Sequence, residues 1–233
     1  VLNALERFKR LRPSLEKEAH IFGNFPSLFM SLVAADGGWE HYDGHIRFVD
    51  SVGNVIADRL DARRYREFIG EAVEPHSYLK SPFYLPLGYP DGMYRVGPLA
   101  RLNVCSHIGT PLADQELREF RDCPNGTATS SFSYHHARLI EILAAIEKIE
   151  RLLDDPDLAS DRLRAQAGIN RLEGVGASEA PRGTLFHDYQ VDEHGLIRRV
   201  NLLIATGQNN LAMNRTVEQI ARHFIRGPRI PEG

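Results

Sequence analysis

The sequence has few cysteines and no long apolar run. Its 233 residues include only two cysteines, Cys105 and Cys123, which form no CxxC pair, so a disulfide framework is not expected. No apolar stretch approaches the roughly 18 residues of a membrane helix, and the first residues do not resemble a secretory signal. The sequence therefore predicts a cytoplasmic protein without a membrane span.

An excess of basic charge is also missing. The 28 Lys and Arg residues are balanced by 31 Asp and Glu, and the formal net charge is -3. Nucleic-acid-binding domains usually carry a concentrated basic surface, so no nucleic-acid partner is expected. There is no Walker sequence, no serine nucleophile elbow and no HExxH zinc motif. Composition and motifs together exclude the commonest nucleotide-binding, hydrolase and zinc-protease classes.

The recurring spacing of apolar residues predicts several helices. These cover 2–20, 61–72, 114–120, 139–153 and 216–224. Pro13 is expected to end one helix in the first range and to begin another. Asp61 is a suitable N-cap, and Thr216 with Gln219 resembles a capping box. On the long helix, Arg138 and Glu141 are expected to form a solvated pair.

The other segments predict short hairpins and loops. Alternating residues predict one hairpin over 46–57 and another over 184–204. Residues 28–30 fall in a looped region, 75–92 form a long ordered loop, 93–104 are strand-like, and 156–178 form a mobile loop. We therefore expect a single domain over 1–233 of the α+β class, mainly helical with short β-hairpins.

The second hairpin carries the candidate binding edge. A turn over 192–195 places residue 182 roughly opposite residue 205, so that Pro181-Arg182 and Ala205-Thr206 meet at the open end. An arginine beside a hydroxyl group could donate hydrogen bonds to a small anion. The alternative is that Arg182 is an ordinary surface arginine. Cys105 and Cys123 are expected as small core residues, and no residue of the chain is predicted to bind a metal.

The residues around this edge resemble a known family. The run Glu179-Ala180-Pro181-Arg182-Gly183, the histidine four residues later and the run from Ala205 to Asn210 are similar to the large subunit of nickel–iron hydrogenases. The segments 94–103 and 209–216 resemble the cytoplasmic, bidirectional, NAD-linked branch. The resemblance extends from about Pro13 to Gly233, and the chain resembles an internal-to-C-terminal fragment.

The resemblance implies a nickel–iron centre whose iron carries carbon monoxide and cyanide. In the family, four cysteines from an RxCGxC and a DPCxxC motif bind the metals, and neither motif occurs here. Cys105 and Cys123 match neither motif. We therefore expect no cofactor on this chain alone, and the isolated chain is expected to be inactive.

The resemblance also implies roles for three residues. Arg182 matches the arginine above the open metal position, where it would polarise H2 and donate toward a cyanide. Pro181 matches the residue that packs on the diatomic ligands, and Thr206 matches a hydroxyl donor to the other cyanide. These donors are expected in a site from which water is excluded.

The resemblance further implies partners and leaves alternatives open. H2 would be the substrate, and electrons would leave through an iron–sulfur small subunit to a flavin module and NAD. The first alternative is a cofactor-free paralogue with a structural or docking role. The second is a small-anion binding module. Because large apolar surfaces normally covered by other parts would be exposed, the fragment is expected to self-associate.

Overall fold

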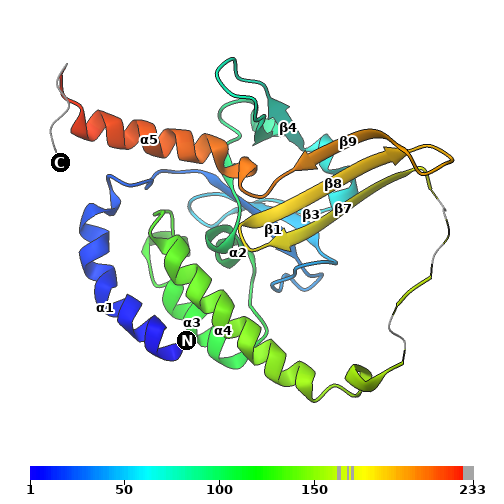
Figure 1. The fold of residues 1–233 in the computed structure, drawn as a ribbon. Coiled ribbons are helices and arrows are strands. Elements are labelled where there is room, and N and C mark those ends of the chain that lie inside the picture. The colour runs from blue at the N-terminus through cyan, green and yellow to red at the C-terminus, as the bar shows by residue number, and fades with distance from the viewer. Residues whose placement is uncertain (162–163, 167, 169–170, 228–233) are drawn as a thin grey trace.

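Five α-helices and three β-sheets account for the regular structure of the part of the chain described by the computed structural model, which covers residues 1–161, 164–166, 168 and 171–227. Helices α1, α3 and α4 gather on one side of the short helix α2, and the three-stranded sheet lies on the other side (Figure 1). The mixed class expected from the sequence is confirmed, with more strand than the sequence analysis anticipated.

The four-stranded sheet has the order β3-β2-β1-β6. Its strands are β1 (Leu28–Val33), β2 (His45–Val49), β3 (Val55–Leu60) and β6 (Tyr94–Arg95). The first predicted hairpin is confirmed by the β2–β3 pairing. The looped assignment of 28–30 is wrong: β1 is a central strand in which every residue is buried. A buried strand lacks the alternation by which half-exposed strands are recognised.

The helix predicted from Asp61 to Ala72 is mostly wrong. Asp61 does cap a helical segment, because its side chain accepts from the Arg63 N–H, but this segment is a 3-10 helix over Ala62–Glu67. Residues Ile69–Ala72 form strand β4, which pairs with β5 (Ser81–Tyr84) inside the region expected to be a loop. Pairing with a second segment therefore decides this conformation.

The three-stranded sheet has the order β7-β8-β9. Its strands are β7 (Glu173–Ala180), β8 (Gly183–Val191) and β9 (Ile197–Leu203), and the hairpin predicted over 184–204 corresponds to β8 and β9. The loop predicted over 156–178 is wrong where β7 begins. Residues 162–163, 167 and 169–170 of that range lie outside the described residues.

Two helices, one at the start of the chain and one near its middle, differ from the sequence prediction. Helix α1 (Leu2–Ala19) continues through Pro13 and does not restart there. The strand-like assignment of 93–104 is wrong after Gly97, because Pro98–Val104 form helix α2, all of whose residues are buried. Complete burial removes the amphipathic signature of a surface helix.

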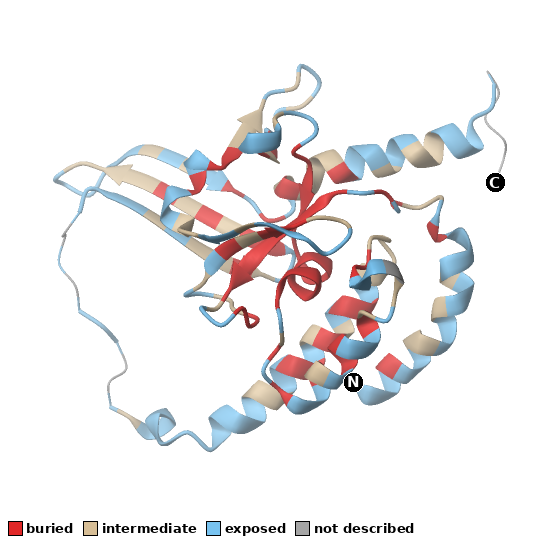
Figure 2. Cartoon of the chain, turned by 180° about the vertical axis from the view of Figure 1, so that it is seen from behind, coloured by how far each residue is buried: buried red, intermediate tan, exposed pale blue. Residues whose placement is uncertain are grey.

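The remaining helices are α3 (Pro111–Phe120), α4 (Ser133–Leu153) and α5 (Asn210–Phe224). The capping box predicted at Thr216 is wrong, because α5 starts at Asn210 and the Thr216 hydroxyl donates to the Ala212 carbonyl at 2.8 Å. The main core surrounds α2, where buried residues of β1, α3 and α4 meet (Figure 2). Helix α2 therefore connects the helical side of the molecule to the sheets.

Candidate functional site

The candidate site lies where a tight turn joins β7 to β8. Ala180 and Gly183 are paired across the turn, which leaves Pro181 and Arg182 at its tip. The Nε of Arg182 donates to the Thr206 hydroxyl oxygen at 3.2 Å. The sequence prediction that these two side chains meet is therefore confirmed.

The register of the hairpin differs from the prediction. Phe186 lies opposite Leu203, two positions later than a turn centred between Glu193 and His194 would require. The difference arises because the connection is longer than expected and the pairing shifts between Gln190 and Val191. Such an irregularity inserts one extra residue into one strand of the pair, here between Ile197 and Arg199 of β9, and so shifts the register.

The Arg182–Thr206 pair lies at the surface. Both side chains belong to exposed residues in this chain, and the exclusion of water from the site stays a prediction. Arg182 uses one N–H on Thr206, and no other hydrogen bond to it is present among the described residues. Its two terminal nitrogens are therefore available to donate to an added anion.

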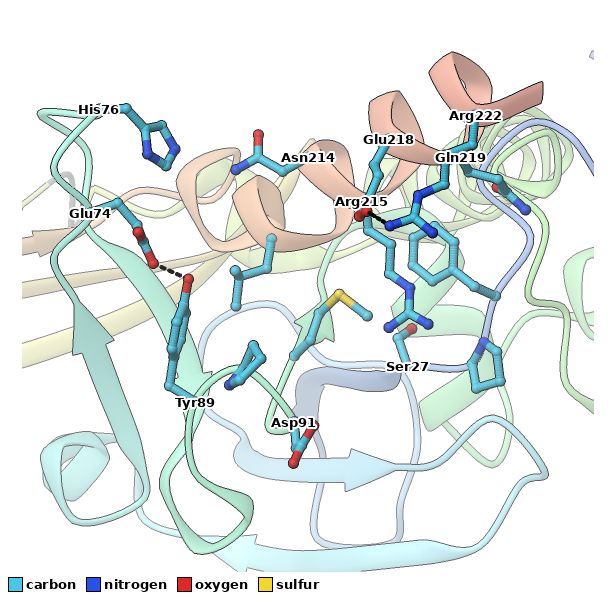
Figure 3. A pocket seen from close by; sticks show the side chains of 15 residues that line it. Ser27, Glu74, His76, Tyr89, Asp91, Asn214, Arg215, Glu218, Gln219 and Arg222 are labelled. Atoms are coloured by element: carbon cyan, nitrogen blue, oxygen red, sulfur yellow. Dashed lines mark hydrogen bonds and ion pairs between the residues drawn. The ribbon is translucent and has the colours of Figure 1, made fainter. Parts of the chain in front are cut away.

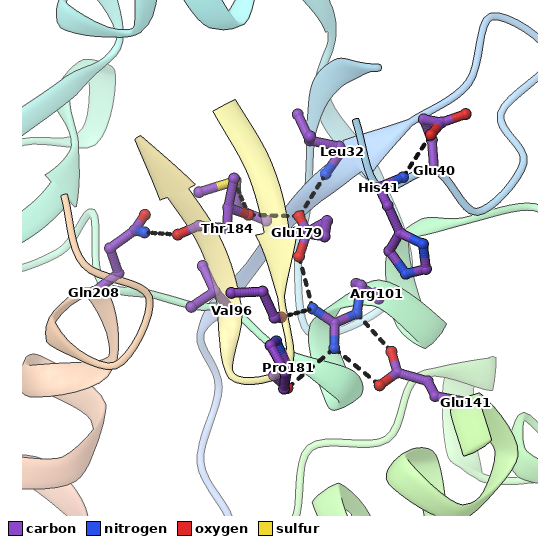
Figure 4. A network of polar contacts seen from close by, with 12 residues as sticks. Leu32, Glu40, His41, Val96, Arg101, Glu141, Glu179, Pro181, Thr184 and Gln208 are labelled. Carbon is purple, nitrogen blue, oxygen red and sulfur yellow. Dashed lines mark hydrogen bonds and ion pairs between the residues drawn. The ribbon is translucent and has the colours of Figure 1, made fainter. Parts of the chain in front are cut away.

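A buried arginine holds the turn from beneath. Arg101 of α2 is 2% exposed and donates to the carbonyl oxygens of Ala180 at 2.9 Å and Pro181 at 3.2 Å (Figure 4). It also forms ion pairs with Glu179 of β7 and Glu141 of α4. One side chain thus ties the turn to two helices.

Glu179 extends this network to the central sheet. One carboxylate oxygen accepts from Arg101 at 2.7 Å, and the other accepts from the Leu32 backbone N–H at 3.0 Å and the Thr184 hydroxyl at 2.6 Å. The Glu179 side chain is 0% exposed. A buried carboxylate is tolerated when all its oxygens have donors, as here.

The Arg138–Glu141 pair predicted to be solvated is wrong for Glu141. Its carboxylate accepts from Arg101 Nε at 2.5 Å and from Nη2 at 2.8 Å, and its side chain is 12% exposed. Burial raises the pKa of Glu141, and the contact with Arg101 offsets part of that rise. Sequence spacing along one helix could not reveal a partner that arrives from another helix.

The Thr206 side of the site is held by a separate set of contacts. Gln208 is buried, donates to the Thr184 carbonyl and accepts from the Tyr94 hydroxyl at 2.8 Å. The Asn209 side chain accepts from the Val96 N–H at 2.9 Å. The run 208–209 was noted in the sequence, but its positioning role follows only from these contacts.

Two glycines allow the turn to approach α2 closely. A Cβ on Gly97 would lie 2.8 Å from the Arg182 carbonyl oxygen, and a Cβ on Gly183 would lie 2.2 Å from Val96 Cγ2. Both glycines have positive φ, 96° and 137°. The backbone before α2 and the turn could not come this close with larger residues.

The described residues do not fit a metal centre by themselves. No group of three His, Cys, Asp or Glu side chains in the described part of the chain is arranged to hold a metal ion. Burial raises the pKa of Cys105 to about 11, and the pKa of Cys123 is also raised by burial. Metals bind the thiolate form of cysteine, and a raised pKa disfavours that form, so neither cysteine is suited to act as a metal ligand.

A separate cavity of about 680 Å³ lies between α5 and the loop around Tyr89 (Figure 3). Two pairs of its polar groups contact each other: Tyr89 donates to Glu74, and Arg222 pairs with Glu218 at 2.5 Å. None of Pro181, Arg182 and Thr206 lines it. The size of this cavity therefore does not bear on the candidate site.

No protein-family model matches the chain, whereas individual proteins do. Over 94% of its residues the chain is 38% identical to a subunit of the F420-non-reducing hydrogenase vhu of Methanocaldococcus jannaschii. Over 88% it is 42% identical to the beta subunit of the NAD-reducing hydrogenase HoxS of Cupriavidus necator. The chain spans about half the length of these relatives, 52% and 43% respectively.

A solved structure agrees with the sequence relatives. A crystal structure of an NAD+-reducing NiFe hydrogenase in the H2-reduced state superposes with a TM-score of 0.91 and 42% identity, covering 99% of this chain and 51% of that one. The resemblance to hydrogenases stated from the sequence is confirmed at this level. The chain is a homologue of hydrogenase subunits and corresponds to about half of their length.

Proposed function

We propose that the chain forms part of the catalytic large subunit of a nickel–iron hydrogenase, which reversibly oxidises H2 to protons and electrons. The observation that carries the proposal is the Arg182–Thr206 hydrogen bond of 3.2 Å, formed within a chain that is 42% identical to an NAD+-reducing NiFe hydrogenase. A fixed pair of donors suits anionic ligands, and the resemblance assigns cyanide to this position.

Each side chain has a defined part in this proposal. Thr206 accepts from Arg182 through its oxygen, so its own O–H can donate outward to one ligand. The terminal nitrogens of Arg182 donate to another ligand and place positive charge near H2, while Pro181 packs against the diatomic groups. Binding and oxidation of H2 would be supplied by the nickel–iron centre. Its ligands are not found among the described residues, and the isolated chain is proposed to be inactive.

The proposed partners are those that the family resemblance implies. We propose a small subunit with iron–sulfur clusters and a flavin module that passes electrons to NAD; NAD as the acceptor is supported by one relative and one solved structure named NAD-reducing hydrogenase. Other relatives are called F420-non-reducing. The proposed location is the cytoplasm; no helix in the described residues is long and apolar enough to cross a membrane.

Metal content tests the proposal. The subunit carrying this chain should be purified from its own cells with its partners, and nickel and iron should be measured together with H2-dependent reduction of NAD and of an artificial dye. Nickel with activity on both acceptors supports the full proposal. Reduction of the dye but not NAD would correct the acceptor alone. A stable complex without nickel would instead support the cofactor-free docking paralogue.

Replacing Arg182 with lysine tests its role within the active complex. Lysine keeps the charge but lacks the planar fork of donors, so it cannot hold Thr206 and a ligand in the fixed geometry of the guanidinium. We expect H2 oxidation to fall by roughly 10²- to 10³-fold while nickel content stays unchanged. Arg198→Lys is the matched control, since Arg198 is also exposed and pairs with Asp192 at the far end of the hairpin. Equal activities of the two variants would reject the assignment.

A further inference from the structure

The guanidinium of Arg101 has no unused donor. An arginine side chain carries five N–H bonds. In Arg101, Nε donates to Glu141, Nη1 donates to Glu179 and the Ala180 carbonyl, and Nη2 donates to Glu141 and the Pro181 carbonyl. The five distances range from 2.5 to 3.2 Å. Because the guanidinium is planar and all its donors are used, it fixes the relative positions of the two carboxylates and the two carbonyl oxygens.

The two carbonyls in this set belong to the residues directly before Arg182. The Glu179 carboxylate that holds Arg101 is in turn fixed by the Leu32 N–H and the Thr184 hydroxyl. The backbone on both sides of Arg182 is therefore tied to the central strand β1 and to helix α2. Figure 4 shows the guanidinium of Arg101 between the turn at Pro181 and the carboxylate of Glu141.

Stability alone does not explain this arrangement. Burying an arginine and two carboxylates has a large desolvation cost, and well-packed apolar residues often give equal or greater stability. What apolar packing cannot supply is a directional hold on two successive carbonyl oxygens. The Arg182 side chain is exposed and makes one side-chain hydrogen bond, to Thr206, so its direction depends on how firmly the turn beneath its Cα is held.

We propose that Arg101, held by Glu179 and Glu141, is a positioning residue that sets the direction of the Arg182 guanidinium toward its ligand. The network fixes the Cα of Arg182, and the contact with Thr206 then fixes the side chain. Arg101 itself is buried, so it acts through the turn that it holds. The inference about catalysis rests on the proposed function, whereas the positioning of the turn does not.

Amide hydrogen exchange tests the positioning without any metal chemistry. In the protein as its own cells assemble it, Arg101→Lys removes the fork but keeps the charge. We expect amide exchange at residues 182–184 to accelerate at least about tenfold, with unchanged exchange at the β8–β9 pair Tyr189 and Val200. Arg47→Lys is the control, because Arg47 holds Asp58 through two bonds of 2.8 and 2.9 Å away from the turn.

A second variant covers the possibility that Arg101→Lys does not fold. Glu141→Gln keeps the contacts of Arg101 with Glu179 and with both carbonyls, and it should raise exchange at the same amides by a smaller factor. Unchanged exchange at 182–184 in the variant that folds, or an equal increase throughout the chain, would overturn the positioning role.

Measurements of H2 oxidation test whether Arg101 acts through Arg182. If Arg101 acts through Arg182, adding Arg101→Lys to the Arg182→Lys variant should cause no further loss of H2 oxidation. Full additivity of the two losses would overturn the link. Should the wild-type complex contain no nickel, the proposed function fails, while the exchange result still decides the positioning role.

Discussion

At the scale of residues, buried charges and close backbone contacts hold the candidate site. Arg101 and Glu179 are almost fully buried, yet the side chain they support, Arg182, is exposed. In the proposed arrangement, the buried charges hold the turn and the exposed Arg182 donates to the ligand. A side chain on a rigid support keeps its direction, which recognition of a small anion requires.

Replacing Gly183 with alanine should test the close approach. The new Cβ would lie 2.2 Å from Val96 Cγ2 at a φ of 137°, so the turn must move or strain. We expect the free energy of unfolding to fall by roughly 2–3 kcal/mol, measured by urea titration. Gly176→Ala in the adjacent strand β7 is the control, because nothing lies within 4 Å of its Cβ. Similar losses from both would contradict the structure.

Two histidines, the buried His136 and the half-buried His41, predict acid sensitivity. The His136 ring stacks on Phe8 and contacts Phe120 edge-on, and its Nε2 has no hydrogen-bond partner among the described residues. Burial, with help from Arg12 and Lys9, lowers its pKa to about 4; burial, Arg101 and Lys148 lower the pKa of His41 to about 4. The unfolded chain therefore binds more protons between pH 6.5 and 4, and stability should fall as pH falls through this window.

The dependence of the unfolding free energy on pH can be measured directly. Each histidine contributes at most about 1.4 kcal/mol per pH unit within the window. Urea midpoints from pH 7 to pH 4.5 should decline in the wild type and decline less in His136→Phe. A wild-type stability that stays constant down to pH 4.5 would show that neither histidine is held neutral.

At the scale of elements, neighbouring segments complete what the local sequence begins. Thr110, the N-cap residue of helix α3, makes no side-chain capping hydrogen bond, and Glu147 of α4 supplies the acceptor instead. The Glu147 carboxylate accepts from the N–H groups of Leu112 and Ala113, both at 2.9 Å. The helix N-terminus is thereby satisfied by a residue 34 or 35 positions away.

Removing this cap should weaken the contact between α3 and α4. Glu147→Ala leaves two backbone N–H groups without their acceptor, so we expect a loss of roughly 1–2 kcal/mol in unfolding free energy. Glu150→Ala, on the exposed surface of the same helix, is the control and should change stability by less than about 0.5 kcal/mol. Circular dichroism during thermal unfolding would measure both, and equal midpoints would refute the capping role.

At the scale of the whole molecule, apolar surface remains uncovered. Part of the apolar stripe on α4 is exposed, with Ile142 at 43% and Ile149 at 55%. On β9 and just after it, Val200, Leu202 and Ile204 are also exposed, while Leu203 between them is buried. Monomeric proteins seldom leave such patches open. These surfaces are where other parts of a hydrogenase complex could pack.

The isolated chain should therefore self-associate. Burial of exposed apolar side chains is favourable by roughly 25 cal/mol per Å². We expect light scattering after size exclusion to give a mass above that of one chain, rising with concentration. The double variant Val200→Lys with Leu202→Lys should shift the population toward monomer. A strictly monomeric wild type at high concentration would show that these apolar faces do not drive self-association.

The sequence by itself determined the features that depend on neighbouring residues. The β8–β9 hairpin, the β2–β3 hairpin and the long helix α4 each carry a regular pattern and a turn or stop signal. The meeting of Arg182 with Thr206 followed from that hairpin. The family motif marked the same residues because they lie together on one edge.

Only the tertiary structure decided which groups surround Arg182 and Thr206. Strand β1 and helix α2 are fully buried, so their apolar sequences give no period. Arg101, Glu141 and Glu179 meet from α2, α4 and β7, and the desolvation of such charges is balanced only by partners distant in sequence. Local patterns report which face of an element is apolar, whereas pairing of buried charges depends on which elements are brought together.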